Sequence, residues 1–127
     1  MSRTLPFSSW PEPDRLAWAT IFAEGDVFDG RGPGAHWAKP TRQAAYYDYR
    51  RWLGFLADHD PAALAKPLAD RVTPARLRAY LESMNELSRV TTATYVRRLL
   101  SILRAAAPER SREWLAEQAR QIGRAHV

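Results

Sequence analysis

Arginine and hydroxyl side chains gather on one side of residues 91–108, a segment that contains no aspartate or glutamate. If successive residues lie 100° apart around a helix, these polar side chains form one face and apolar side chains the other. The planar fork of arginine pairs with phosphate oxygens and base edges, so this face has the chemistry to enter the major groove of DNA. The residues of the predicted polar face are Thr94, Arg97, Arg98, Ser101 and Arg104.

A second interpretation of this face is a solvated surface that only keeps the protein in solution. Solvated helix faces usually mix acidic and basic residues, because opposite charges three or four positions apart attract each other. A face with three arginines and no acid therefore favours contact with nucleic acid.

The positive charge of the chain is concentrated after residue 38. Residues 1–38 hold three basic and five acidic residues, whereas residues 39–127 hold 16 basic and nine acidic ones. Of the 19 basic residues, 17 are arginine. A high-GC genome would also enrich arginine, so the placement of the arginines carries the argument rather than their number.

Other kinds of site lack the residues they require. The chain has no cysteine, and its histidines, at positions 36, 59 and 126, share no helical face, so no metal site is predicted. Residues 25–34 are rich in glycine but lack the Gly-Lys-Ser/Thr ending of a phosphate-binding loop, and Asp26 and Asp29 are too few for a calcium loop. We therefore predict no cofactor.

The sequence also lacks the segments that would place the protein in a membrane. No run of 18 apolar residues is present, and the first ten residues lack a basic flank followed by an apolar signal segment. We expect a cytoplasmic protein that does not enter a membrane.

The elements that position the arginines are all predicted to be helices, because no stretch alternates as a strand would. Prolines and acids near residue 11 begin a short helix that runs to about residue 24. A longer helix begins near Pro40 and ends at residues 58–61, since Pro61 cannot continue it. The apolar arc of this longer helix consists of Ala45, Tyr49, Trp52, Phe55 and Leu56.

Three more helices are predicted after a short connection that contains proline. Thr73 caps the first of them, with Pro74 at its first position, and its buried stripe continues to Met84. The next runs over residues 91–106. The last runs over residues 109–122 and stops before Gly123.

In their order and spacing these segments resemble the core-binding domain of tyrosine recombinases, the phage-integrase family. The resemblance covers nearly the whole chain, although its motifs are mostly helix-core and helix-start positions. Upstream, residues 10–18 and 25–37 are similar to the amino-terminal part of one bacterial integrase subgroup. The motifs of the core are Thr41 with YYDYRRWLGFL at 46–56, RVTPARLRAYL at 71–81, TTATYVRRLLSILR at 91–104, and Trp114 with Leu115.

The resemblance implies an all-α bundle of four to five helices, of the integrase core-binding type, over residues 39–122. An N-terminal helical extension over 1–38 precedes it, and a tail at 123–127 follows it. In this family the small helical domain grips one side of a DNA duplex while a separate catalytic domain closes on the other side. The implied function is a DNA-binding module of a site-specific recombinase. Its implied partners are double-stranded DNA and, on that DNA, a recombinase catalytic domain or further protomers.

We expect the catalytic domain to be absent from this chain, and no catalytic residue is carried over. Family members cleave DNA with a tyrosine assisted by arginines, a lysine and a His-x-x-Arg segment. Here Lys39 and Ala62 stand three residues after the first two histidines, and the third lies at the chain end. The five tyrosines are expected to be half-buried helix residues with hydroxyls at the surface. The chain is therefore not expected to be an enzyme.

Several positions contact DNA if the resemblance holds. Arg98 and Arg104 match the family's run around Ser101 best, whereas Arg97 follows from the helical periodicity. Each of these residues also has an alternative role. Thr41 could instead cap its helix, and Tyr47 could either stack on a base or pack against its own helix. Each arginine could instead be solvated or paired within the protein. The full set is Thr41, Arg42, Arg50, Arg51, Thr94, Arg97, Arg98 and Arg104.

Three other functions compete with this one. A helix-turn-helix regulator would use the helices that begin near Thr73 and Thr91, but residues 85–90 lack the glycine expected in its tight turn. A helical protein-interaction domain would direct its arginines at an acidic partner. An independent enzyme ranks last.

Overall fold

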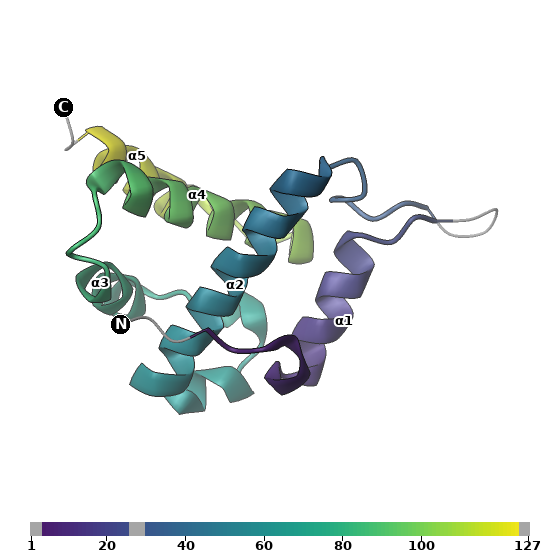
Figure 1. Ribbon diagram of the computed structural model, residues 1–127, viewed down its shortest axis with the longest axis horizontal. Helices are drawn as coiled ribbons and strands as arrows, with labels where there is room; N and C mark the ends of the chain where they lie inside the picture. The colour runs from purple at the N-terminus through teal and green to yellow at the C-terminus, as the bar shows by residue number, and fades with distance from the viewer. Residues whose placement is uncertain (1–3, 26–29, 125–127) are drawn as a thin grey trace.

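The computed structural model describes residues 4–25 and 30–124, and every regular element within them is helical (Figure 1). The predicted all-α class is therefore confirmed. Asp26, Asp29, His126 and the end of the predicted tail lie outside the described residues. The α-helices are α1 (Glu12–Ile21), α2 (Lys39–His59), α3 (Pro74–Ser83), α4 (Arg89–Ala106) and α5 (Glu113–Arg124), and short 3₁₀ turns are η1 (Phe7–Ser9), η2 (Pro61–Ala65) and η3 (Leu68–Asp70).

Local signals explain where the central helices begin. The hydroxyl of Thr73 accepts a hydrogen bond from the backbone N–H of Arg76 at 3.2 Å, as its predicted role as a cap requires. α4 begins at Arg89 rather than at residue 91, because the Ser88 hydroxyl caps it by accepting from the Thr91 N–H at 3.1 Å.

The last helix differs more from its prediction. A turn follows Pro108, closed by a hydrogen bond from the Arg110 N–H to the Ala107 carbonyl, so α5 begins only at Glu113. It then continues through Gly123 to Arg124, beyond the predicted end. A glycine near a helix end weakens the helix without obliging it to stop.

α4 is the central helix of the bundle. α2 crosses in front of it, α5 lies along its length, and α1 packs beside it on the far side from α3 (Figure 1). Seven of its residues are buried, among them Val96 and Leu103, which are fully covered. Only one ridge of α4 is left for solvent or a partner.

The predicted N-terminal extension shares the core of the other helices. Leu5 and Trp10 are buried in the same apolar cluster as Trp52 and Leu103. The indole Nε1 of Trp10 donates to the Leu5 carbonyl at 2.9 Å, and the Leu5 N–H donates to the Arg50 carbonyl at 3.0 Å. The first 25 residues therefore belong to the body of the domain wherever they are described.

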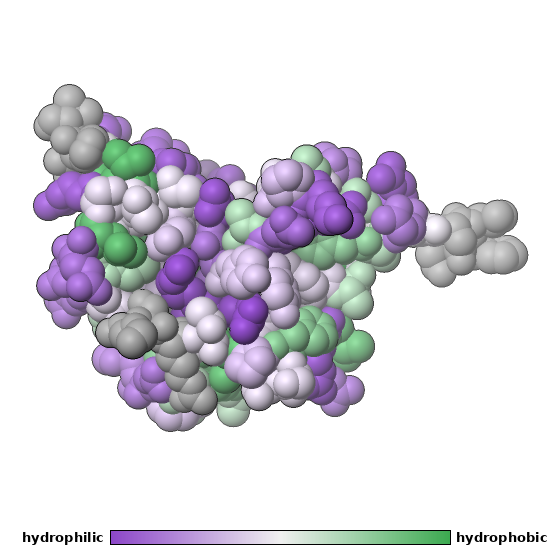
Figure 2. Space-filling model, viewed as in Figure 1, coloured by the Kyte–Doolittle hydropathy of each residue, from purple (hydrophilic) through white to green (hydrophobic). Residues whose placement is uncertain are grey.

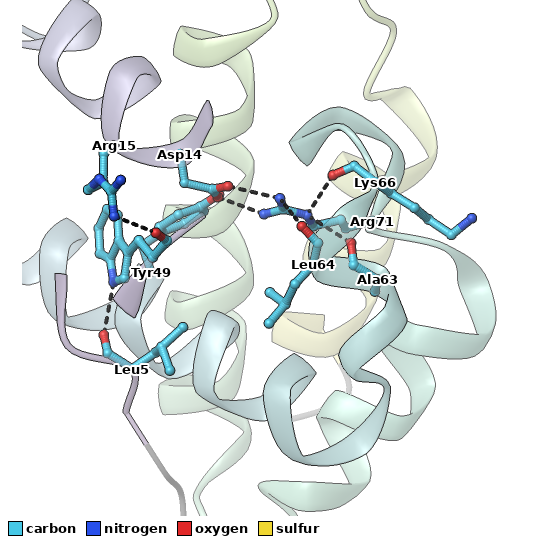
Figure 3. Close-up of polar contacts among 9 residues, drawn as sticks. Leu5, Asp14, Arg15, Tyr49, Ala63, Leu64, Lys66 and Arg71 are labelled. Carbon is cyan, nitrogen blue, oxygen red and sulfur yellow. Dashed lines mark hydrogen bonds and ion pairs between the residues drawn. The ribbon is translucent and has the colours of Figure 1, made fainter. Parts of the chain in front are cut away.

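A buried ion pair fastens α1 to the rest of the fold (Figure 3). The Arg71 guanidinium donates from Nη1 and Nη2 to the two Asp14 oxygens, at 2.6 and 2.8 Å, and both side chains are almost completely buried. The Tyr49 hydroxyl of α2 donates to the same carboxylate. The remaining Arg71 donors reach the carbonyls of Ala63, Leu64 and Lys66.

This cluster extends one expectation and corrects another. Asp14 lies in the first turn of α1, as expected for the acids near residue 11, and it also binds an arginine 57 residues away. The Tyr49 hydroxyl was predicted to be at the surface, but Tyr49 is only 2 % exposed. Burial, reinforced by the Asp14 carboxylate, raises the pKa of Tyr49 well above its ordinary value.

Replacing Trp52 by alanine should lower the free energy of unfolding by about 3 to 5 kcal/mol, because a large cavity replaces a side chain that is 1 % exposed. Thermal melting measures the effect. Tyr47→Ala is the matched control, since this aromatic residue of the same helix is exposed. Equal melting temperatures for the Trp52 variant and the wild type would contradict the packing of α2.

Asp14→Asn should lower the free energy of unfolding by about 3 to 5 kcal/mol, because it leaves the buried Arg71 charge without its partner. Urea denaturation measures this loss. Arg110→Gln breaks the exposed pair with Asp70 and should change stability far less. Similar losses in the two variants would show that the Asp14 site is open to solvent.

Candidate nucleic-acid interface

The polar face predicted for residues 91–106 is the outer ridge of α4. Its side chains cover an arc of about 120° between the α2 flank and the α5 flank. Arg98 lies at the α2 flank, where it meets Asp48. Arg97 lies at the α5 flank, where a side chain added at Gly123 would come within 3.8 Å of it. Arg97, Ser101 and Arg104 are exposed, and Thr94 and Arg98 are half-buried.

The two hydroxyls of this ridge are held by their own helix. The Thr94 hydroxyl donates to the Val90 carbonyl at 2.9 Å, and the Ser101 hydroxyl donates to the Arg97 carbonyl at 3.1 Å. Arg97 donates from Nη2 to the Thr94 hydroxyl at 3.3 Å. Arg104 makes no hydrogen bond or ion pair to any described residue.

A carboxylate that the helix periodicity did not show approaches the ridge from α2. Asp48 is buried, and one of its oxygens accepts from Arg98 Nη1 at 2.9 Å. Its other oxygen accepts from Arg51 Nη1 at 3.3 Å, and the Arg51 guanidinium lies 4.3 Å from the centre of the Tyr95 ring. Two predicted contact residues from different helices are thereby brought together on one buried acid.

The Asp48 carboxyl titrates above its ordinary range. Burial raises its pKa from 3.8, and the two arginines, Arg98 first, only partly oppose this. The ionised acid therefore costs the folded state more than the neutral acid would. The pairing with Arg98 and Arg51 offsets only part of this cost.

The structure gives the other two predicted arginines of α2 internal roles. Arg42 donates from Nε to the Trp37 carbonyl at 3.0 Å and from Nη2 to the Ala35 carbonyl, and it lies over the Phe22 ring. Arg50 reaches the Leu5 carbonyl at 3.4 Å. Both fasten the N-terminal part of the chain to α2.

Thr41 and Tyr47 are exposed on α2. Thr41 is not the cap of its helix, because α2 begins two residues earlier, after Ala38, which provides no side-chain cap. Tyr47 is 57 % exposed, and the Arg50 guanidinium lies 5.5 Å from its ring centre.

The side of the molecule on which α2 crosses α4 is mostly polar. Figure 2 shows hydrophilic and neutral side chains over both helices, with strongly hydrophobic residues confined to separate small areas. A hollow of about 250 Å³ lies between the two helices and is lined by Trp37, Thr41, Ala45, Arg98 and Ser101. This hollow contains no carboxylate among its lining residues.

A second hollow, of about 320 Å³, is apolar in character and lies elsewhere, between α3, the start of α4 and the end of α5. Leu81, Met84, Leu87 and Ile122 contribute its apolar lining. Across residues 4–25 and 30–124, no three metal-binding side chains lie close enough to hold an ion. None of the described helices has the length and apolar character needed to cross a membrane.

Comparison of the chain with protein-family models, with curated proteins and with solved structures found no match.

Sequence reasoning missed Asp48 as a partner of the ridge. At 100° per residue Asp48 lies about 20° from Phe55 and about 40° from Trp52, within the apolar arc of its helix. The available signal was therefore an acid among buried positions, which requires a cationic partner that the pattern of one helix could not identify.

The pKa of Asp48 predicts a pH dependence that the Asp48→Asn variant should remove. A carboxyl whose pKa is raised by folding holds its proton better in the native state, so its stabilising contribution is complete below pH 3.8 and is lost as the pH rises through the raised pKa. Wild-type stability minus variant stability should therefore fall as the pH rises above 3.8 and through the raised pKa.

Urea denaturation at several pH values measures this difference. At neutral pH the variant should be at least as stable as the wild type. If the free energy of unfolding of the wild type instead increases relative to that of the variant as the pH rises, the Arg98 and Arg51 pairings outweigh the burial cost.

Proposed function

We propose that this chain is a DNA-binding module, of the kind that a tyrosine recombinase uses to grip one side of a duplex, and that the outer ridge of α4 makes the central contact. One observation carries the proposal: Arg97, Arg98 and Arg104 line a ridge that holds no acid of its own, on the central helix of the bundle. Alongside them, Arg51 extends the positive surface onto α2.

The dimensions of the ridge suit a major groove. An α-helix of 18 residues is about 27 Å long, and a major groove about 12 Å wide admits one helix. Thr94 and Ser101 leave small side chains between the arginines, so the ridge can approach base edges while the arginines reach phosphates.

The internal roles of Arg42 and Arg50 narrow the proposed contact set. Each would have to break bonds to backbone carbonyls before it could bind DNA. The proposal therefore rests on Arg51, Arg97, Arg98 and Arg104, together with Thr41 and Thr94. It assigns Arg42 and Arg50 to the fold.

The proposal gives this chain no part in cleaving DNA. Phosphotyrosine chemistry needs a nucleophile set among several cations in one pocket. Tyr49 and Tyr80 are each 2 % exposed, and burial raises the pKa of both phenols. Strand transfer would belong to a partner catalytic domain on the same DNA.

Changing Arg97, Arg98 and Arg104 together to glutamine should weaken binding to a duplex and flatten its salt dependence. If all three meet phosphates, the slope of log K against log salt should fall in magnitude by about 2.7, at about 0.9 per contact. Fluorescence anisotropy with a labelled duplex at several salt concentrations measures the slope, and circular dichroism checks the helix content.

A control variant carries the same change in charge elsewhere. Arg110, Arg120 and Arg124 are exposed and pair with acids away from the ridge, so their triple glutamine variant should keep the slope. Equal flattening in both variants would indicate a general charge effect. A wild type that binds no duplex even at low salt would overturn the proposal in favour of a protein-interaction domain.

A further inference from the structure

The hollow between α2 and α4 is a recess on the proposed DNA-binding side, in which Trp37 and Ala45 form apolar walls beside three polar side chains. Its volume of about 250 Å³ far exceeds the roughly 30 Å³ that one water molecule occupies. Arg98 and Ser101 of α4 line one wall, and Thr41 of α2 lines the other. The recess therefore offers an anion one cation and the Thr41 hydroxyl, because the Ser101 hydroxyl already donates to the Arg97 carbonyl. No carboxylate lines the recess to repel an anion.

Arg98 has unused hydrogen-bond donors at this recess. It uses Nη1 for Asp48, while its Nε and Nη2 make no hydrogen bond to described residues. The Thr41 hydroxyl is likewise unbonded within the described chain. An arginine fork with two unused N–H groups and a nearby hydroxyl matches the oxygens of a phosphate.

The position of Arg98 is set by Asp48. The Asp48 side chain is only 7 % exposed, whereas the Arg98 side chain is 41 % exposed, so the acid sits behind the arginine and the arginine faces outward. The second Asp48 oxygen accepts from Arg51 at 3.3 Å, so both oxygens of the carboxylate are engaged. Arg98 is thus held in one orientation before any ligand arrives, which lowers the entropy cost of binding.

We propose that this recess seats one backbone phosphate of the bound duplex, and that Asp48 is a positioning residue that holds Arg98 toward it. The inference rests on the proposed function, because the phosphate belongs to the same duplex that the ridge contacts.

The Asp48→Asn variant tests the inference through the sign of its effect. Removing a negative charge near a polyanion should strengthen binding if Asp48 acts only through its charge. A positioning role predicts the opposite: affinity about tenfold weaker, as expected for losing one charge-assisted hydrogen bond, and a salt slope smaller by about 0.9.

Two comparisons separate positioning from a general effect. Glu12→Gln makes the same change in charge at an exposed position of α1 and should not weaken binding. In a double-mutant cycle, Asp48→Asn should cost nothing further once Arg98→Gln is present, because Asp48 acts through Arg98. Thermal melting of each variant shows whether the fold is intact.

The outcomes distinguish the two proposals. Absence of duplex binding by the wild type would overturn the proposed function itself. If the wild type binds and Asp48→Asn binds equally well or more tightly, the phosphate seat is wrong while the ridge contact stands. Should the Asp48 variant fail to fold, Thr41→Val decides instead: the phosphate seat predicts weaker binding at unchanged stability, and unchanged affinity would overturn it.

Discussion

The bidentate pair between Asp14 and Arg71 is the interaction on which the arrangement of this fold depends. It joins α1 to the segment between η3 and α3, and through the Tyr49 hydroxyl it also joins α2. A charged pair buried this deeply persists only if every donor and acceptor is satisfied, and here three backbone carbonyls complete the Arg71 shell. The pair therefore ties together three segments that are far apart in the chain, and α1 packs against α4 beside them.

A second buried carboxylate, Asp48, lies on α2. The two acids, Asp14 and Asp48, differ in how far their arginine partners are exposed. Asp14 binds an arginine that is wholly buried, so that site is closed. Asp48 binds Arg98 and Arg51, whose guanidinium groups reach the surface, so that site is open. Burial raises the pKa of Asp48, so keeping this acid ionised has a cost that the two arginines only partly offset. The proposed role in orienting Arg98 toward a phosphate gives a physical reason for keeping an acid there.

Periodicity and proline placement predicted the helical class, the burial of Trp52 and the Thr73 cap, because these depend on neighbours close in sequence. The same reasoning could not predict partners far apart in the chain. Asp14 and Arg71 are separated by 57 residues, and Asp48 and Arg98 by 50. Nor could it separate Arg42 and Arg50, which bind backbone carbonyls, from Arg97 and Arg104, which face solvent. Those distinctions come from tertiary packing, and the periodicity of one helix does not show which residues of other segments pack against it.

The central claim is that DNA lies against the α4 ridge and the adjoining face of α2. The most direct measurement is an NMR titration of the isotope-labelled protein with a short duplex at low salt, following backbone amides and arginine Nε–H groups. We expect shifts along α4 at Thr94, Arg97, Arg98 and Ser101 and at Arg51 of α2, with the Arg71 signal unchanged. Shifts confined to α3 and α5, or none at all, would contradict it.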